Sequence, residues 1–218
     1  MNACLRDRGQ SSANQKGVNG LNNVRRADRR RRKVVGVMGS SSAPHADLSA
    51  TVGVIVANLG CHLLTGGGHG VMAAVSEAFS GVSGRAGVVI GVIRASDEVR
   101  SGLREGKRPY APRTPPNEWV EIPIFTHLPD SGPDGKSPTS RNHINVLTSD
   151  VVVALPGGQG TLSEVELALE YEWPLILFVG SGTIGGRSPH DLARNASGSI
   201  AIAESRRALE KYLNPYRS

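Results

Sequence analysis

The sequence predicts an α/β fold: a doubly wound, Rossmann-like, mostly parallel sheet with helices on both faces, in a single domain. From residue 33 onward, short β-branched runs alternate with segments of helical periodicity. These runs are apolar throughout, as in parallel strands that are buried on both faces. Turns rich in glycine or serine at 39–42, 66–70 and 157–160 each follow a strand. Ligands of such folds bind at that edge of the sheet.

The first half of the domain is two strand-helix units and a third strand. Val34–Met38 is an apolar run and predicts the first strand. Pro44 suits a first helical turn, so we expect a helix over Pro44–Leu59. His62–Thr65 predicts the second strand, and the helical spacing of Val71, Met72, Val75 and Phe79 predicts a helix over Gly70–Phe79. Gly87–Ile93 predicts the third strand.

A polar, proline-rich loop, Arg94–Glu118, separates the two halves of the domain. It leads to a fourth strand near Trp119–Ile124. A further loop through Pro129, Pro133 and Pro138 ends at a helix near Ser140–Thr148.

The last four elements follow that helix. The apolar run Val151–Leu155 predicts a fifth strand, and a glycine turn separates it from a helix over Thr161–Tyr171. Pro174–Val179 predicts the sixth strand. Ile200–Leu213 predicts a terminal helix.

Composition favours a soluble, cytoplasmic protein with no membrane partner. No run approaches the ~18 apolar residues that span a bilayer, and no apolar core of a secretory signal follows the first residues. The two cysteines, Cys4 and Cys61, predict no disulfide framework. The six histidines form no HxxxH or HExxH pair and no CxxC is present, so we expect no metal centre. The absence of a GxSxG elbow gives no support to serine-hydrolase chemistry.

The charge is concentrated at the N-terminus. Residues 1–33 hold ten of the 25 Lys and Arg residues and two of the 19 Asp and Glu residues, so the remainder is slightly acidic. We expect residues 1–32 to be a basic, disordered extension and residues 33–218 to be the Rossmann-like nucleotide-binding domain. The alternative is that Arg25–Lys33 binds nucleic acid or an anionic membrane. The near-neutral body argues against nucleic-acid binding as its function.

The segment Pro156–Glu164, PGGQGTLSE, is the most informative in the chain. Glycines between a strand and a helix let the backbone approach a phosphate, and the N–H groups of the first helical turn point at it. Glu164 is expected in that first turn, where a carboxylate beside a phosphate suggests chemistry. The alternative is a structural role, in which the carboxylate of Glu164 interacts favourably with the helix dipole.

A second glycine loop, Gly66–Met72, follows the second predicted strand but lacks the GxGxxG spacing of a dinucleotide site. Tight turns alone also require glycine. Arg141 begins the helix before the fifth strand. It is either a surface residue or a cation that faces the cleft and pairs with a phosphate or with Glu164.

Together GGGHGVM at 66–72, Ser140-Arg141-Asn142 and PGGQGTLSE resemble the Lonely Guy (LOG) family, once labelled lysine decarboxylases. The resemblance spans about residues 34–180. It implies a dimeric Rossmann-like protein that hydrolyses the N-glycosidic bond of nucleoside 5′-monophosphates, cytokinin nucleotides among them, to free base and ribose 5-phosphate, with no required cofactor. It implies Arg141 and Glu164 as the catalytic pair.

The resemblance also implies that the glycine loops form the phosphate and ribose cradle. The residues expected to contact the ligand are Gly39, Ser40, Gly67, Gly68, Gly70, Met72, Asn142, Pro156, Gly157, Gly158, Gly160 and Thr161. In the hydrolase mechanism, Glu164 stays ionised and either stabilises an oxocarbenium-like ribose or acts as general base on water.

Two features depart from the hydrolases of this family. Arg141 is followed by Asn142 where those hydrolases usually have lysine, and the Arg94–Glu118 insert has no clear counterpart. The Arg-Asn pair and the Leu-Ser-Glu continuation are similar to a branch that includes the molybdenum cofactor carrier proteins, whereas Pro156 is typical of the hydrolases. The alternative function is therefore a non-catalytic carrier that binds a phosphorylated pterin such as the molybdenum cofactor. We expect a homodimer or higher homo-oligomer. The Thr161–Tyr171 helix is apolar enough to serve the core, an interface or both.

Overall fold

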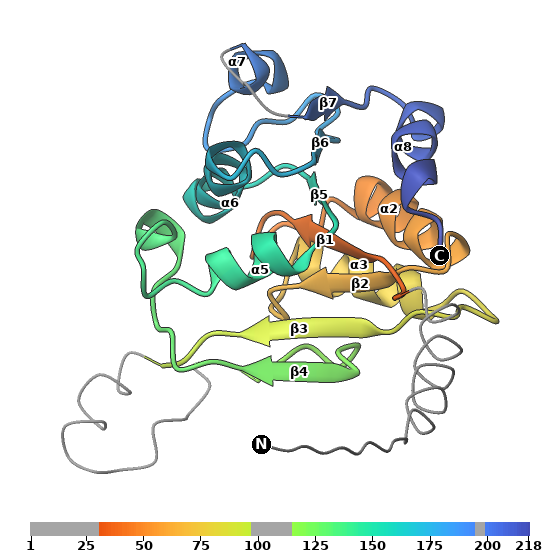
Figure 1. The fold of residues 1–218 in the computed structure, drawn as a ribbon, viewed down its shortest axis with the longest axis horizontal. Helices are drawn as coiled ribbons and strands as arrows, with labels where there is room; N and C mark the ends of the chain where they lie inside the picture. The colour runs from red at the N-terminus through yellow and green to blue at the C-terminus, as the bar shows by residue number, and fades with distance from the viewer. Residues whose placement is uncertain (1–30, 97–114, 195–198) are drawn as a thin grey trace, which may run out of the picture. The chain divides into compact units, whose positions relative to one another are not determined.

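Seven parallel strands form one sheet in the order β4-β3-β2-β1-β5-β6-β7 (Figure 1). The structure, a computed structural model, describes residues 31–96, 115–194 and 199–218. The strands are β1 Val34–Met38, β2 His62–Thr65, β3 Val89–Ile93, β4 Ile122–Phe125, β5 Val151–Ala154, β6 Leu175–Leu177 and β7 Ile200–Ile202. The helices in the described part are α2 Ala46–Asn58, α3 Val71–Ser80, α5 Asn142–Thr148, α6 Gln159–Glu170, α7 Pro189–Ala193 and α8 Arg206–Leu213, with short 3₁₀ turns at η1 Gly132–Asp134 and η2 Asn214–Tyr216.

β1 lies at the centre of the sheet and brings distant parts of the sequence together. All five of its residues are buried. It pairs with β2, from Val34 against His62, and with β5, from Val35 against Val151. Strand order reverses at β1, because the chain adds β2, β3 and β4 on one side and β5, β6 and β7 on the other. The carboxyl ends of β1 and β5 therefore form the crevice in which doubly wound folds bind ligands.

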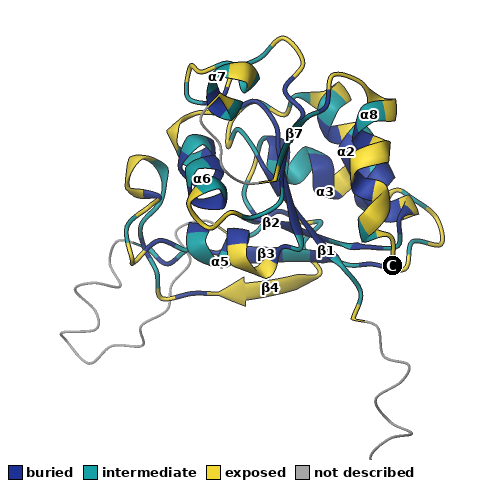
Figure 2. Cartoon of the chain, turned by 45° about the horizontal axis from the view of Figure 1, so that its top comes forward, coloured by how far each residue is buried: buried dark blue, intermediate teal, exposed yellow. Residues whose placement is uncertain are grey.

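Helices cover both faces of the sheet, and successive strand residues alternate between two apolar clusters (Figure 2). Val35 and Val37 of β1 join the cluster made with α2, α3 and α8. Val34 and Met38 join the cluster made with α5, α6 and α7. The predicted doubly wound α/β fold is thus confirmed, and its central strands read as continuous apolar runs because both faces are covered.

β4 is the most exposed strand of the sheet. All four of its residues are exposed, with Phe125 retaining 48% of its accessible surface. It pairs only with β3, through Ile122 against Ile90. Pro123 lies within it, and a proline without an N–H is tolerated in a strand at the edge of a sheet.

The predicted terminal helix over Ile200–Leu213 is wrong in its first part. Ile200–Ile202 is the seventh strand and pairs with β6, and the helix begins at Arg206. Ser205 separates the two elements, because its hydroxyl accepts the N–H of Ala208 and caps α8. The short helix α7, capped by Ser188, was not predicted.

The other predicted boundaries agree to within a few residues, with two segments outside the described residues. β4 begins at Ile122, later than the predicted Trp119. Most of the basic extension and most of the Arg94–Glu118 loop lie outside the described ranges. Arg32–Ser218 forms one compact unit. In the described residues, no helix is both long and apolar enough to cross a membrane.

Candidate functional site

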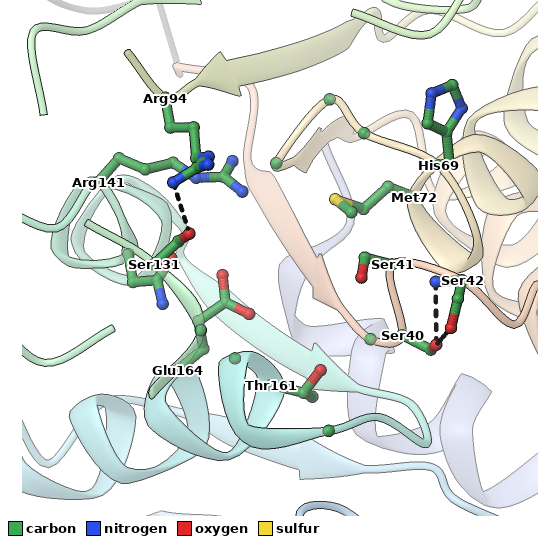
Figure 3. A pocket seen from close by; sticks show the side chains of 18 of the residues that line it. Ser40, Ser41, Ser42, His69, Met72, Arg94, Ser131, Arg141, Thr161 and Glu164 are labelled. Atoms are coloured by element: carbon green, nitrogen blue, oxygen red, sulfur yellow. Dashed lines mark hydrogen bonds between the residues drawn. The ribbon is translucent and has the colours of Figure 1, made fainter. Parts of the chain in front are cut away.

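Three strand-helix loops meet around one pocket of about 520 Å³ at the carboxyl edge of the sheet (Figure 3). They are Gly39–Ser42 after β1, Gly66–His69 after β2 and Gly158–Thr161 after β5. The segments Ile93–Arg94 and Ser131–Pro133 complete the wall. The pocket therefore lies where the strand order reverses, as the three glycine- and serine-rich turns of the sequence predicted.

Backbone hydrogen bonds hold these loops against one another. The N–H of Ser40 donates to the carbonyl of Pro156 at 3.0 Å, and the N–H of Val71 donates to the carbonyl of Ser40 at 2.9 Å. The β1 loop is thus fixed to the loops of β5 and β2. Gly157 permits this approach, because a Cβ there would lie 2.1 Å from the Thr161 hydroxyl and 3.0 Å from the Ser40 nitrogen.

The first turn of α6 presents backbone donors to the pocket. Leu162 is the first residue whose N–H bonds back along the helix, to the Gly158 carbonyl at 3.0 Å. The N–H groups of Gln159, Gly160 and Thr161 have no hydrogen-bond acceptor within the described residues, and all three residues line the pocket. Unpaired N–H groups at a helix N-terminus form an anion site.

Arg141 immediately precedes α5 and its guanidinium is buried at the pocket wall. Its Nη1 donates to the carbonyl of Val92 on β3, whereas its buried Nε has no partner. The guanidinium lies over Gly66, where a Cβ would be 2.3 Å from Nη1. Burial lowers the pKa of Arg141, the nearby Glu164 raises it, and Arg94 lowers it. Arg141 is therefore a cleft residue, and the surface alternative is excluded.

Glu164 lies in the second turn of α6, because the helix begins at Gln159, two residues earlier than predicted. The prediction that Glu164 occupies the first turn is therefore wrong. Its carboxyl points into the pocket (Figure 3), with only 8% of the residue exposed. The Asn145 Nδ2 donates to Oε1 at 2.8 Å. Burial raises the pKa of Glu164, while Arg141 and the Asn145 hydrogen bond lower it. The net direction is upward, because desolvation outweighs both, whereas the ionised Glu164 of the hydrolase mechanism stays a prediction.

Arg94 and Ser131 belong to the pocket and were not predicted. Arg94 follows β3, and its Nη1 donates to the Pro129 carbonyl at 2.6 Å and to the Ser131 hydroxyl at 3.1 Å. The side chains of Arg94, Arg141 and Glu164 thus line the same pocket (Figure 3). The signal for Arg94 was its place directly after a strand, at the same edge as the glycine loops.

Most of the residues predicted to form the site line this pocket. Those that line it are Gly39, Ser40, Gly67, Gly68, Met72, Arg141, Asn142, Gly158, Gly160, Thr161 and Glu164. Gly70, Pro156 and Gly157 lie just behind the lining and shape its loops. The lining residues absent from the predicted site are Ser41, Ser42, Gly66, His69, Ile93, Arg94, Pro115, Ser131, Gly132, Pro133 and Gln159.

The site shows no arrangement for binding a metal. Among the residues that the structure describes, no group of three or more His, Cys, Asp or Glu side chains could hold a metal ion. His69 lines the pocket beside the Gly66–Gly68 turn, without a second such residue from its own loop.

Several solved structures share this fold. The molybdenum cofactor binding protein from the phototrophic bacterium Rippkaea orientalis is 29% identical, with a TM-score of 0.62, over 87% of this chain and 99% of its own. The molybdenum cofactor carrier protein from Chlamydomonas reinhardtii is 25% identical, with a TM-score of 0.60, over 85% of this chain and 98% of its own. DNA processing protein A from Helicobacter pylori, described with a single-stranded DNA binding mode, shares the fold alone at 16% identity and a TM-score of 0.54, over 85% of this chain and 82% of its own.

The sequence comparison places the chain in a family. No curated protein matches it significantly. Residues 32–208, which include every strand and every residue of the pocket wall, match the SLOG cluster4 family. The chain therefore belongs to the SLOG cluster4 family.

Proposed function

We propose that the pocket binds a phosphorylated small molecule of the nucleotide or pterin class, with its phosphate on the first turn of α6. The observation that carries this proposal is the set of three N–H groups, those of Gln159, Gly160 and Thr161, which face the pocket without an acceptor. The helix dipole and the guanidinium of Arg141 add positive potential to the same space. The glycines at 158 and 160 leave the backbone accessible to a phosphate oxygen.

The rest of the pocket suits a flat heterocycle. Its volume of about 520 Å³ falls within the ~300–1,000 Å³ of small-molecule sites. Met72 and Ile93 supply apolar surface, while Ser41 and Arg94 supply polar groups. A ligand with a phosphate at one end and a polar ring system at the other therefore matches the lining.

The biological role that we propose is that of a carrier for a phosphorylated pterin such as the molybdenum cofactor. Support comes from two relatives that match over nearly their whole length, a molybdenum cofactor binding protein and a molybdenum cofactor carrier protein. Arg141 and Glu164 would then contact the ligand: the partly buried Arg141 donates to the Val92 carbonyl, and the buried Glu164 accepts a hydrogen bond from Asn145.

A second candidate is hydrolysis of nucleoside 5′-monophosphates. One observation favours it: the Glu164 carboxyl enters the pocket near a guanidinium and one turn beyond the phosphate site. Cleavage would break the N-glycosidic bond, with the bonding electrons leaving on the base. Water then adds to the sugar carbon, Glu164 accepts its proton and the base takes one from solvent, which gives ribose 5-phosphate and free base. Ionised Glu164 is required for the water step.

Several apolar side chains of α6 serve the core of the chain. Val165, Leu167 and Ala168 of α6 are buried in the core of the chain itself. The apolar surface of the helix that suggested an interface is thus largely used within one subunit. The homodimer stays a prediction, as does the view that the body does not bind nucleic acid.

Thermal unfolding of the purified protein with AMP, GMP and molybdopterin, each beside its dephosphorylated form, tests the binding proposal. We expect at least one phosphorylated compound to raise Tm and its dephosphorylated form to have little effect. Chromatography of the same mixtures distinguishes a hydrolase from a carrier. Release of base that disappears in Glu164→Gln supports the hydrolase, whereas binding without any release supports the carrier.

A further inference from the structure

The environment of Glu164 contains a second functional side chain, that of Asn145. Asn145 lies on α5 one helical turn after Arg141, and it is wholly buried. Its Nδ2 donates to Oε1 of Glu164 at 2.8 Å, so the amide and the carboxyl face each other across the α5–α6 contact. Asn145 does not line the pocket, and it acts on the site only through Glu164.

The two oxygens of Glu164 are therefore not equivalent. Oε1 is occupied by the amide of Asn145. Oε2 has no hydrogen-bond partner among the described residues and is not among the fully buried unpaired atoms, and the carboxyl points into the pocket (Figure 3). A proton on this carboxyl would reside on Oε2, because Oε1 already accepts an N–H. The atom presented to a ligand is thus Oε2.

Asn145 has no evident structural advantage at this position. Its Oδ1 is buried and has no hydrogen-bond partner. A buried acceptor without a donor destabilises a fold, and an apolar side chain of the same size would avoid that cost. Only the contact with Glu164 distinguishes asparagine from leucine here.

We propose that Asn145 is a positioning residue for Glu164: its amide holds Oε1, directs Oε2 at the ligand and stabilises the ionised carboxylate. The role at the ligand rests on the function proposed above. The charged groups around the carboxyl are Arg141, the residue before α5, which attracts it, and Arg94, which acts on Arg141. Asp134 of η1, which packs on α6, is exposed. Removing the amide donor leaves Arg141 as the main group that favours ionisation.

The direct test is the titration of Glu164 by ¹³C NMR in protein with labelled glutamate, with the signal assigned by its loss in Glu164→Gln. We expect the midpoint in Asn145→Leu to lie at least about one pH unit above that of the wild type, because a hydrogen bond to the charged form is lost. Ser149→Ala is the matched control. It removes a buried hydroxyl that donates to the backbone carbonyl of Asn145 and leaves the side-chain amide in place. Its midpoint should equal that of the wild type.

An unchanged midpoint in Asn145→Leu would overturn the proposal, as would an equal shift in Ser149→Ala. If Asn145→Leu fails to fold, Asn145→Ala removes the same donor without adding volume. In Asn145→Leu, the pH dependence of the affinity for AMP should move to higher pH by the same amount as the NMR midpoint. If the wild type binds no phosphorylated probe, the function proposed above fails, whereas the titration still decides whether Asn145 controls Glu164.

Discussion

Gly66 shows how a single hydrogen atom in place of a side chain shapes the site. The Arg141 guanidinium occupies the space that a Cβ at residue 66 would need. We expect Gly66→Ala to displace Arg141 from the Val92 carbonyl and to weaken binding of the phosphorylated ligand at least tenfold. Calorimetric titration measures this loss. Gly81→Ala is the control, because its added Cβ would meet only ordinary contacts at 3.5 Å or more.

The raised pKa of Glu164 predicts a pH dependence of stability. Burial makes the folded protein hold this proton more tightly than the unfolded chain does. The contribution of Glu164 to stability is therefore fully present below the ordinary glutamate pKa of ~4.3 and is lost as pH rises through the folded pKa. Glu164→Gln cannot ionise. We expect the Tm of Glu164→Gln to rise relative to that of the wild type as pH rises from 4 to 8. A difference in Tm that does not change with pH would contradict a raised pKa of Glu164.

The sequence predicted the residues of the site that belong to motifs. The glycine loops were recognised from the spacing of a strand, a turn and a helix start, whereas Arg141 and Glu164 were assigned as a pair by the resemblance to the Lonely Guy family. Arg94 and Ser131 were missed because side chains of two separate loops converge only in the folded chain. The raised pKa of Glu164 could not be predicted for a related reason, since desolvation depends on how closely α5 and α6 pack.

The residues that border each element explain which elements were predicted well. β1 and β2 begin and end where predicted, because glycine turns or polar residues bound their apolar runs. Ile200–Ile202 was assigned to a helix because three apolar residues have no clear period of their own. Ser205 was the available signal, since serine before a helical segment predicts a new start. The Ser188-Pro189 pair likewise marks the start of α7.

Ser205 gives a prediction at the scale of the element. Its hydroxyl accepts the N–H of Ala208 at 3.2 Å, and α8 packs Leu209 and Leu213 against the core. We expect Ser205→Ala to lower the free energy of unfolding by about 1 kcal/mol. Urea denaturation measures the change. Ser83→Ala, in an exposed turn, should leave the midpoint within error, and an equal loss in both variants would rule out the cap.

At the scale of the whole molecule, the described site lies within the body of the chain. Every residue that lines the pocket falls between Gly39 and Glu164. We expect a chain of residues 32–218 to bind the phosphorylated ligand with the affinity of the full protein. A marked loss of affinity on removal of residues 1–31 would show that the basic extension takes part in binding.

The sheet also determines what the molecule can bind. The order of the strands brings the ends of β1, β2 and β5 to one edge, and the donors of α6 point into the space between them. The fold and the proposed phosphate site thus follow from the alternation of strands and helices together with one glycine motif. The identity of the ligand's ring system does not follow from the sequence. The residues near it, Arg94, Ser131 and Met72, lie on separate segments that share no sequence motif.

The most direct test of the phosphate site removes one backbone donor from α6. Gln159 is the first residue of the helix, where proline fits without breaking a helical hydrogen bond, and the extended Gly158 before it is compatible with proline. Gln159→Pro deletes one N–H, whereas Gln159→Ala keeps that N–H and removes the side chain.

Calorimetric titration should use the phosphorylated compound that stabilises the wild type most. We predict that Gln159→Pro binds it at least about tenfold more weakly than the wild type does, whereas Gln159→Ala binds it with nearly the wild-type affinity. Neither substitution should change the affinity for the dephosphorylated compound. Equal affinity of the wild type and Gln159→Pro would contradict a phosphate site at the start of α6.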